Sequence, residues 1–391
     1  MARPKKKGIY LYINGRLGWR QLTMKDFVKF SNFQSETVDR ILKRPNCDLR
    51  QRFVLNFLRE NEIPEEKSGY SQDWPAYNKA QQNEKLILMS LLDELLTYIP
   101  FPERKSVGRK PFPFRDKIFH LVLQSYNVKS SRRCISDLEI SRKLGYIEKK
   151  PHFNSVLKSL KDSSLTPYLK HLVEISGLPL QQVESNFATD SSGFGTTLFG
   201  RWFDVRTGTY EQKRRFMKCH LTCGVQSNII TAVNITNGWS ADAPEFSDLI
   251  KKTSKNYNIN EVSADKAYCS RENVKIVGEL GGIPFIPFKS NIKMTSVCKS
   301  NHMWKKMLFF YHMYPDEFNR FYHRRSNVET VFHMIKRKFG SHLRSKTKAG
   351  QINEILAKCL CHNLCVLIQE ALELGIELDF KKCAGMDIAH N

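Results

Sequence analysis

The sequence is short of negative charge. Its 391 residues include 39 acidic side chains against 62 lysines and arginines, which gives a formal net charge of +23 at pH 7 and a pI of about 9.6. A chain with this excess of positive charge usually binds a polyanion, and nucleic acid is the commonest one. Net charge does not separate DNA from RNA, and a ribosome-associated protein or a merely basic enzyme is the alternative.

Long apolar runs are also missing. No stretch reaches about 18 uninterrupted apolar residues, the length that a membrane-spanning helix needs. The closest stretch, residues 355–372, is broken by charged and polar side chains. The basic residues 1–7 run directly into mixed sequence, without the apolar segment of a secretory signal. We therefore expect a cytoplasmic protein with no membrane partner.

Cysteine pairs with the spacing of a zinc site are missing too, although the chain has ten cysteines. Cys219 and Cys223 have no second pair at finger-like spacing. Cys359, Cys361 and Cys365 fall on one predicted helix, where spacings of 2, 4 and 6 residues cannot all converge on one tetrahedral ion. We expect buried free thiols rather than structural zinc.

Composition and the spacing of apolar residues divide the chain into segments. Residues 1–104 are basic and read as helical, and residues 105–184 predict short helices again. From residue 185 to residue 350 strand-like runs alternate with helices, interrupted by a small irregular, basic and aromatic insert at about 289–320. Residues 351–391 hold a closing helix and a tail. The sequence therefore predicts a helical basic region followed by an α/β domain.

The helical region contains a candidate helix-turn-helix. A helix is expected over residues 136–145, followed by a Gly-Tyr turn and a second basic helix from Phe153. This order is that of a DNA-binding motif. Ordinary packing of two helices around a glycine is the alternative.

The α/β part predicts a mixed sheet. Strands are expected at residues 185–190, 216–225, 228–236, 261–265 and 283–288, and helices at 244–254, 271–280 and 352–374. Antiparallel strands come first and βαβ units second, which makes a mixed sheet with helices over it. Asp242 is the expected N-cap of the first of these helices.

Three acidic residues are candidate metal ligands. Asp190 and Asp265 each end a strand-like run, and Glu329 falls on a predicted long helix. Carboxylates that share a pocket cannot all stay ionised without compensating charge, and Mg²⁺ or Mn²⁺ suits all-oxygen ligation. Two such ions about 3.5–4 Å apart can assist displacement at phosphorus. The alternative for each Asp is a turn or cap residue.

Glu329 shares its predicted helix with other chemically useful side chains. Tyr322, Arg325, Glu329 and Lys336 lie at offsets 0, 3, 7 and 14, which on an α-helix fall within about 60° of one another. The adjoining stripe is apolar and typical of core packing. Its members are Val328, Val331, Phe332, Ile335 and Phe339. A solvated ion pair between Arg325 and Glu329 is the alternative.

Three segments resemble the catalytic blocks of DDE transposases from prokaryotic insertion sequences. They are residues 188–194, residues 263–268, and the spaced set Tyr322, Arg325, Glu329 and Lys336, which is similar at every spacing to the signature known as YREK. Residues 218–221, the Asn237-Gly238 turn and residues 362–364 are also similar to this family. The resemblance covers residues 185–370 well and 108–184 more loosely.

The resemblance implies an RNase H-like core preceded by a mainly helical DNA-binding region. Asp190, Asp265 and Glu329 would bind two Mg²⁺ (or Mn²⁺) ions. The implied protein is a DNA transposase that nicks the ends of an insertion sequence and joins the freed 3′-hydroxyl to target DNA. Its DNA partners would be the terminal inverted repeats and the target. It would act as a homodimer or higher oligomer, associated with the nucleoid of a prokaryotic cytoplasm.

The resemblance also implies phosphate contacts. Tyr322, Arg325 and Lys336 would hold backbone phosphates near the cleaved end, because the Arg fork suits bidentate contact and Lys a point contact. Two alternatives to transposition stay open. One is an RNase H-like nuclease that cuts without joining, and the other is a domesticated, catalytically silent DNA-binding protein.

One feature departs from the family. Only 329 − 265 = 64 positions separate Glu329 from Asp265, so the β-rich insert that many relatives carry before the Glu helix must be small here. Trp239 and Trp304 are candidates for stacking on a flipped base. Core or surface packing is the alternative for each.

Overall fold

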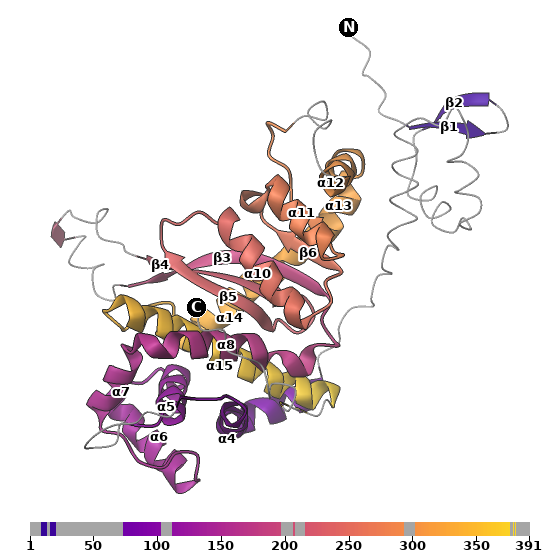
Figure 1. The fold of residues 1–391 in the computed structure, drawn as a ribbon. Coiled ribbons are helices and arrows are strands. Elements are labelled where there is room, and N and C mark those ends of the chain that lie inside the picture. The colour runs from indigo at the N-terminus through magenta and orange to yellow at the C-terminus, as the bar shows by residue number, and fades with distance from the viewer. Residues whose placement is uncertain are drawn as a thin grey trace. The chain divides into compact units, whose positions relative to one another are not determined.

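The computed structural model describes residues 9–13, 16–20, 73–102, 112–196, 206–207, 216–292 and 302–375, with Leu378 and Phe380. The chain divides into two compact units, residues 1–71 and residues 72–391 (Figure 1). The predicted domain limits at residues 104, 184 and 350 stay predictions.

The described residues of the first unit form a hairpin. Strand β1 (Ile9–Ile13) pairs antiparallel with β2 (Arg16–Arg20). Helices were expected throughout this region, so the prediction is wrong for these residues. The missed signal is local: a β-branched and aromatic run is followed by the Asn14-Gly15 dipeptide, a strong hairpin signal. The rest of the region expected to be helical, from residue 21 to residue 72, lies outside the described residues.

The second unit begins with a layer of helices. They are α4 (Trp74–Thr97), α5 (Phe114–Asn127), α6 (Ser131–Lys143), α7 (Phe153–Leu160) and α8 (Thr166–Ser176). The turn between α6 and α7 contains Gly145, whose φ of +84° favours glycine. The two helices of the candidate helix-turn-helix are therefore present, and their role in reading DNA stays a prediction.

A long apolar helix, α15 (Lys348–Leu374), lies beside α8 under the sheet (Figure 1). It packs against α4, α5 and α8 and reaches strand β5 (Figure 1). By length and composition α15 could cross a membrane, but its most apolar window is 72% buried, as in the core helix of a soluble protein. Cys359 and Cys361 on α15 are buried, as expected, whereas Cys365 is only half-buried.

The sheet has five strands in the order β5-β4-β3-β6-β7. They are β3 (Asn186–Gly195), β4 (Phe216–Gly224), β5 (Ile230–Asn237), β6 (Glu261–Ala264) and β7 (Ile283–Phe285). The pairs β3–β4 and β4–β5 are antiparallel, whereas β3–β6 and β6–β7 are parallel. The predicted mixed sheet with β3 at its centre is confirmed, and with its flanking helices the architecture is RNase H-like.

Helices cover both faces of this sheet (Figure 1). Helix α10 (Ala243–Asn256) packs on β4 and β5 from one side, next to α11 (Arg271–Glu279). Helix α14 (Ser326–Phe339) packs on β3 and β4 from the other. Its contacts come from the predicted apolar stripe, which is fully buried.

The expected irregular insert is largely helical. Helix α12 (His302–Met313) and helix α13 (Pro315–Tyr322) occupy its second half. The prediction failed because the aromatic density of α12 is a buried packing face, formed by residues such as Phe309 and Phe310. Pro315 lies in the first turn of α13, where proline starts a helix rather than breaking one.

Two further corrections concern the site. The long helix expected to carry Tyr322 to Lys336 is broken: α13 ends at Tyr322, a 3-10 turn spans His323–Arg325, and α14 begins at Ser326. Strand β3 also does not end at Asp190 but continues to Gly195, because its antiparallel partner β4 keeps pairing with it to that point.

Candidate active site

Two carboxylates lie side by side at the centre of the sheet. Thr189 of β3 is in register with Ala264 of the parallel strand β6, so Asp190 and Asp265 are the next residues of adjacent strands. The Asp190 carboxylate accepts a hydrogen bond from the Ser191 N–H at 2.8 Å. Asp265 precedes a 3-10 turn but its side chain makes no capping hydrogen bond. The Asp265 carboxylate therefore makes no hydrogen bond to the turn that follows it.

Arg325 joins the third acid to this pair. One guanidinium nitrogen lies 2.8 Å from Asp190 Oδ2 and the other lies 2.6 Å from Glu329 Oε1. The predicted ion pair between Arg325 and Glu329 therefore exists, but it is not a purely solvated one, because the same guanidinium reaches β3. The structure thus brings Glu329 to Asp190 through Arg325 rather than by direct contact.

The remaining signature residues surround the same strand. The Tyr322 hydroxyl lies 3.5 Å from Asp265 Oδ1, and the Arg325 guanidinium lies 5.8 Å from the centre of the Tyr322 ring. Lys336 Nζ donates to Ser192 Oγ at 2.6 Å. Although the helix is broken after Tyr322, three of the four signature side chains therefore contact β3 or Asp265 directly, and Glu329 is linked to them through Arg325.

The electrostatics of the site follow from its burial. Burial raises the pKa of Asp190, and the neighbouring Asp265 and Glu329 charges add to this rise, while Arg325 opposes it. Burial works against the charged form of Arg325, but its bond to Glu329 and the nearby acids raise its pKa overall. Burial also raises the pKa of Tyr322. The three carboxylates therefore interact with one another, and Arg325 supplies the compensating charge.

A fourth carboxylate was not predicted as part of the site. Asp242 lies at the expected N-cap position of α10, but its side chain makes no capping hydrogen bond to the helix. Its Oδ1 accepts instead from Ser191 Oγ at 2.6 Å and lies 2.7 Å from Lys218 Nζ and 3.3 Å from His220 Nδ1. Burial acts to raise the pKa of Asp242, but its bonds to Lys218 and Ser191 outweigh burial and lower it.

Asp242 supports the residue that follows Asp190. Ser191 stands in register with His220 on the neighbouring strand, which places its hydroxyl in the reach of Asp242. A signal for this network was present in the sequence, because residues 218–221 and the turn before Asp242 share the family resemblance. The contact itself needs β3, β4 and the start of α10 to be placed in space.

The two tryptophans lie in different environments. Trp304 on α12 is only 4% exposed and packs edge-on against Phe288, with ring centroids 4.8 Å apart. Trp304 is therefore part of the core, which is the alternative to stacking on a flipped base. Trp239 follows β5 and is 96% exposed, so its ring is accessible to a partner.

This arrangement is that of an RNase H-like catalytic domain: acids on two adjacent central strands and a third on a helix across the sheet. Residues 182–364 match the family model described as the transposase DDE domain. This part of the chain is therefore similar to the DDE domain of transposases. Neither a search of curated proteins nor a search of solved structures found a match.

The donor set suits a hard divalent cation, because all three side chains offer carboxylate oxygens. Their present positions do not yet form a complete ligand shell. Among the residues that the structure describes, no three His, Cys, Asp or Glu side chains are close enough together to hold a metal ion. Arg325 pairs with both Asp190 and Glu329, so Glu329 contacts the guanidinium rather than the two aspartates.

Proposed function

We propose that this protein is an active DNA transposase of a prokaryotic insertion sequence, which cleaves the ends of the element and joins the freed 3′-hydroxyl to target DNA. The observation that carries the proposal is the register of β3 with β6, which sets Asp190 beside Asp265. Glu329 completes the set through Arg325. The spacing of the YREK signature supports the assignment to insertion sequences.

Asp190, Asp265 and Glu329 would hold two Mg²⁺ (or Mn²⁺) ions. When bound, such ions activate the attacking oxygen and stabilise the leaving oxygen in displacement at phosphorus. The protein's own contribution is the placement of the acids on rigid elements, with the Asp190 carboxylate oriented by the Ser191 N–H. Asp242 in turn holds the Ser191 side chain.

Arg325, Tyr322 and Lys336 are proposed to hold backbone phosphates. Arg325 now neutralises two carboxylates at once. Once Glu329 turns toward the aspartates, the guanidinium of Arg325 is released for bidentate contact with a phosphate. Lys336 lies on the same side of β3, at Ser192. Burial lowers the pKa of Lys336, so a phosphate close to its ammonium would favour the charged form.

The wider context is also a proposal. We infer that residues 105–184 bind DNA through α6 and α7, because Arg132 and Arg133 on α6 are exposed. A homodimer or higher oligomer would hold both inverted repeats in the nucleoid. With a net charge of +23, binding to DNA should weaken steeply as salt rises.

The test is Mg²⁺-dependent cleavage and joining, with a labelled duplex that carries the element's own end and an unlabelled target. Wild-type protein should give a nicked product and a strand-transfer product, and Asp190→Ala should give neither. Glu329→Gln should abolish cleavage and keep specific end binding. Its matched control is Glu279→Gln, because Glu279 is also an exposed acid in an i,i+4 ion pair, with Lys275 on α11.

The outcomes separate the alternatives. Cleavage that survives in Glu329→Gln would refute the triad. Cleavage without joining in the wild-type protein would identify an RNase H-like nuclease, and specific binding with neither reaction would identify a catalytically silent DNA-binding protein.

A further inference from the structure

A cationic pocket opens where the candidate active site ends. It has a volume of about 320 Å³ and lies between α5, the end of α14, the segment that follows α14, and α15. Its charged lining consists of Lys129, Lys336, Arg344, Lys358 and Glu354, with His342 beside them. Lys336 belongs to both places, because it lines this pocket and donates to Ser192, two residues after Asp190.

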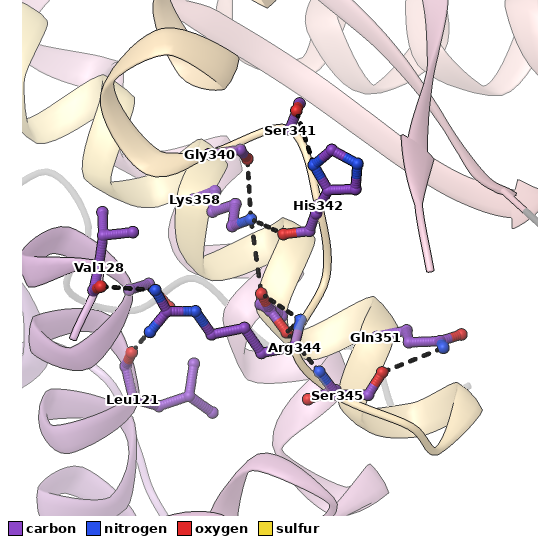
Figure 2. A network of polar contacts seen from close by, with 11 residues as sticks. Leu121, Val128, Gly340, Ser341, His342, Arg344, Ser345, Gln351 and Lys358 are labelled. Atoms are coloured by element: carbon purple, nitrogen blue, oxygen red, sulfur yellow. Dashed lines mark hydrogen bonds and ion pairs between the residues drawn. The ribbon is translucent and has the colours of Figure 1, made fainter. Parts of the chain in front are cut away.

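The segment at the mouth of the pocket is held rigidly by two residues of α15 (Figure 2). The Glu354 carboxylate accepts from the backbone N–H groups of Arg344 at 3.0 and 3.1 Å and of Ser345 at 3.0 Å. Lys358 Nζ donates to the carbonyls of Gly340 and His342, both at 2.9 Å. Glu354 also lies 3.4 Å from Lys358 Nζ, so the one carboxylate of the pocket offsets that charge. Lys129 is paired with Asp137 at 3.1 Å. The remaining positive charge of the lining comes from Lys336 and Arg344.

The same segment is fixed to the catalytic strand. The N–H of Gly195, the last residue of β3, donates to the Ser341 carbonyl at 3.2 Å, and the Leu343 N–H donates to the Gly195 carbonyl at 2.8 Å. Gly195 lies five positions after Asp190. The segment is thus a rigid continuation of the sheet that carries the aspartate.

Side chains alternate along this extended segment. Leu343 and Ser345 are buried, whereas His342, Arg344 and Lys346 are exposed. The side chains of an extended chain point alternately to opposite sides, so the cationic ones form a row on the outer side. Arg344 is further oriented by the bond from its Nη2 to the Val128 carbonyl, at 2.6 Å.

We propose that this row, together with the pocket behind it, is a binding track for the phosphates of duplex DNA that leads away from the cleavage point. The track is defined by His342, Arg344 and Lys346, and it begins at Lys336. The proposal rests on the proposed function for the position of the scissile phosphate. Preorganised cations bind phosphates at a lower ordering cost. The clamp by Glu354 and Lys358 orders the backbone of the segment, and the bond to Val128 orients the Arg344 side chain.

The test compares two charge-matched double variants of the full chain. Arg344→Gln with Lys346→Gln removes two charges from the track. Lys251→Gln with Lys275→Gln removes two charges from exposed positions on α10 and α11, which lie on the other face of the sheet. Binding of a fluorescein-labelled duplex is measured by anisotropy over a series of salt concentrations, and thermal unfolding is followed in parallel.

The track variant should bind about tenfold more weakly, and its salt slope should fall by about 1.8, or 0.9 for each lost phosphate contact. The control should bind within about twofold of the wild type. Arg344→Lys should keep the wild-type slope, because it keeps the charge. If the salt slope of Arg344→Lys instead falls as far as that of Arg344→Gln, Arg344 acts through its bond to Val128 rather than through its charge, and the proposal fails.

Equal salt slopes for the track and control variants would also overturn the track. This failure can be told apart from failure of the proposed function, which would leave wild-type protein without cleavage or joining whatever the binding data show. A track variant that unfolds early is replaced by Lys346→Gln alone, for which the expected change in slope is about 0.9.

Discussion

At the scale of single residues, Arg325 has the largest electrostatic role. It is the counter-ion of Asp190 and Glu329 at once, and its charge opposes the rise that burial causes in the pKa of Asp190. We infer that the same side chain alternates between the acids and a DNA phosphate. Its position in a 3-10 turn between α13 and α14, rather than in a continuous helix, lets it reach across to β3.

Arg325→Ala should therefore slow cleavage of the element's end by about 10²-fold, the usual effect of removing one well-placed electrostatic group. Affinity for a random duplex should change little. Single-turnover cleavage and anisotropy measure the two effects, and Lys275→Ala on α11 is the control for loss of one positive charge. If Arg325→Ala lost affinity equally for the element's end and for random DNA, Arg325 would be a general electrostatic contact.

At the scale of secondary-structure elements, α15 is joined to the sheet by one buried amide. The Asn363 side chain accepts from the Ile230 N–H at 2.9 Å and donates to the Ile230 carbonyl at 2.8 Å, so it pairs with β5 as another strand would. It also donates to the Val173 carbonyl and to Ser176 Oγ. Asn363 therefore ties α15, α8 and β5 together.

Asn363→Leu keeps a similar volume but leaves these buried backbone groups unpaired. It should destabilise the protein by about 1–3 kcal/mol for each group that stays unsatisfied. Urea unfolding measures the change. Gln369→Leu removes an amide from a half-buried position of the same helix and should stay within about 0.5 kcal/mol of the wild type. A loss no larger than that of the control would show that the Asn363 bonds do not stabilise the fold.

The elements also show how far the sequence could be interpreted. Helices α10, α11 and the buried stripe of α14 followed from period, because each has one clear apolar face. The strands followed from short apolar runs, although β7 ends at Phe285 rather than at residue 288. The extent of β3 beyond Asp190 did not, because it depends on pairing with β4. The break before Ser326 was missed because the four signature residues keep helical spacing across it. Such features are decided by tertiary contacts rather than by local propensity.

The candidate site was predictable in its parts and not in its connections. The positions of Asp190, Asp265 and Glu329 could be picked from spacing and resemblance. The bridge through Arg325 could not, because a long side chain has many rotamers and the choice depends on acids far away in sequence. The same holds for Asp242, whose partners Ser191 and Lys218 come from two other strands.

At the scale of the whole molecule, the helical layer and the catalytic sheet share one core. Helix α15 lies within the matched family segment for most of its length, yet it packs on α4, α5 and α8, which precede that segment. His362 lies in this shared core, is 2% exposed, and its Nε2 donates to the Asn228 carbonyl at 2.9 Å. A change in its charge therefore acts on the stability of the whole unit.

Burial lowers the pKa of His362 from 6.5 to about 4. Between these values the unfolded chain binds a proton that the folded chain does not, so the free energy of unfolding should decrease as pH falls from about 6.5 to about 4. Burial lowers the pKa of His120 on α5 as well, to about 3, and adds to this effect. Urea unfolding midpoints at a series of pH values measure the slope.

His362→Gln keeps an N–H donor for Asn228 and removes the titration, so its pH profile should be flatter than that of the wild type over this range. His333→Gln, at an exposed position on α14, should leave the profile unchanged. If His362→Gln and the wild type lose stability in parallel, the acid sensitivity of the shared core has another origin. His120→Gln, at a buried position on α5, is then the variant that separates one buried histidine from the other.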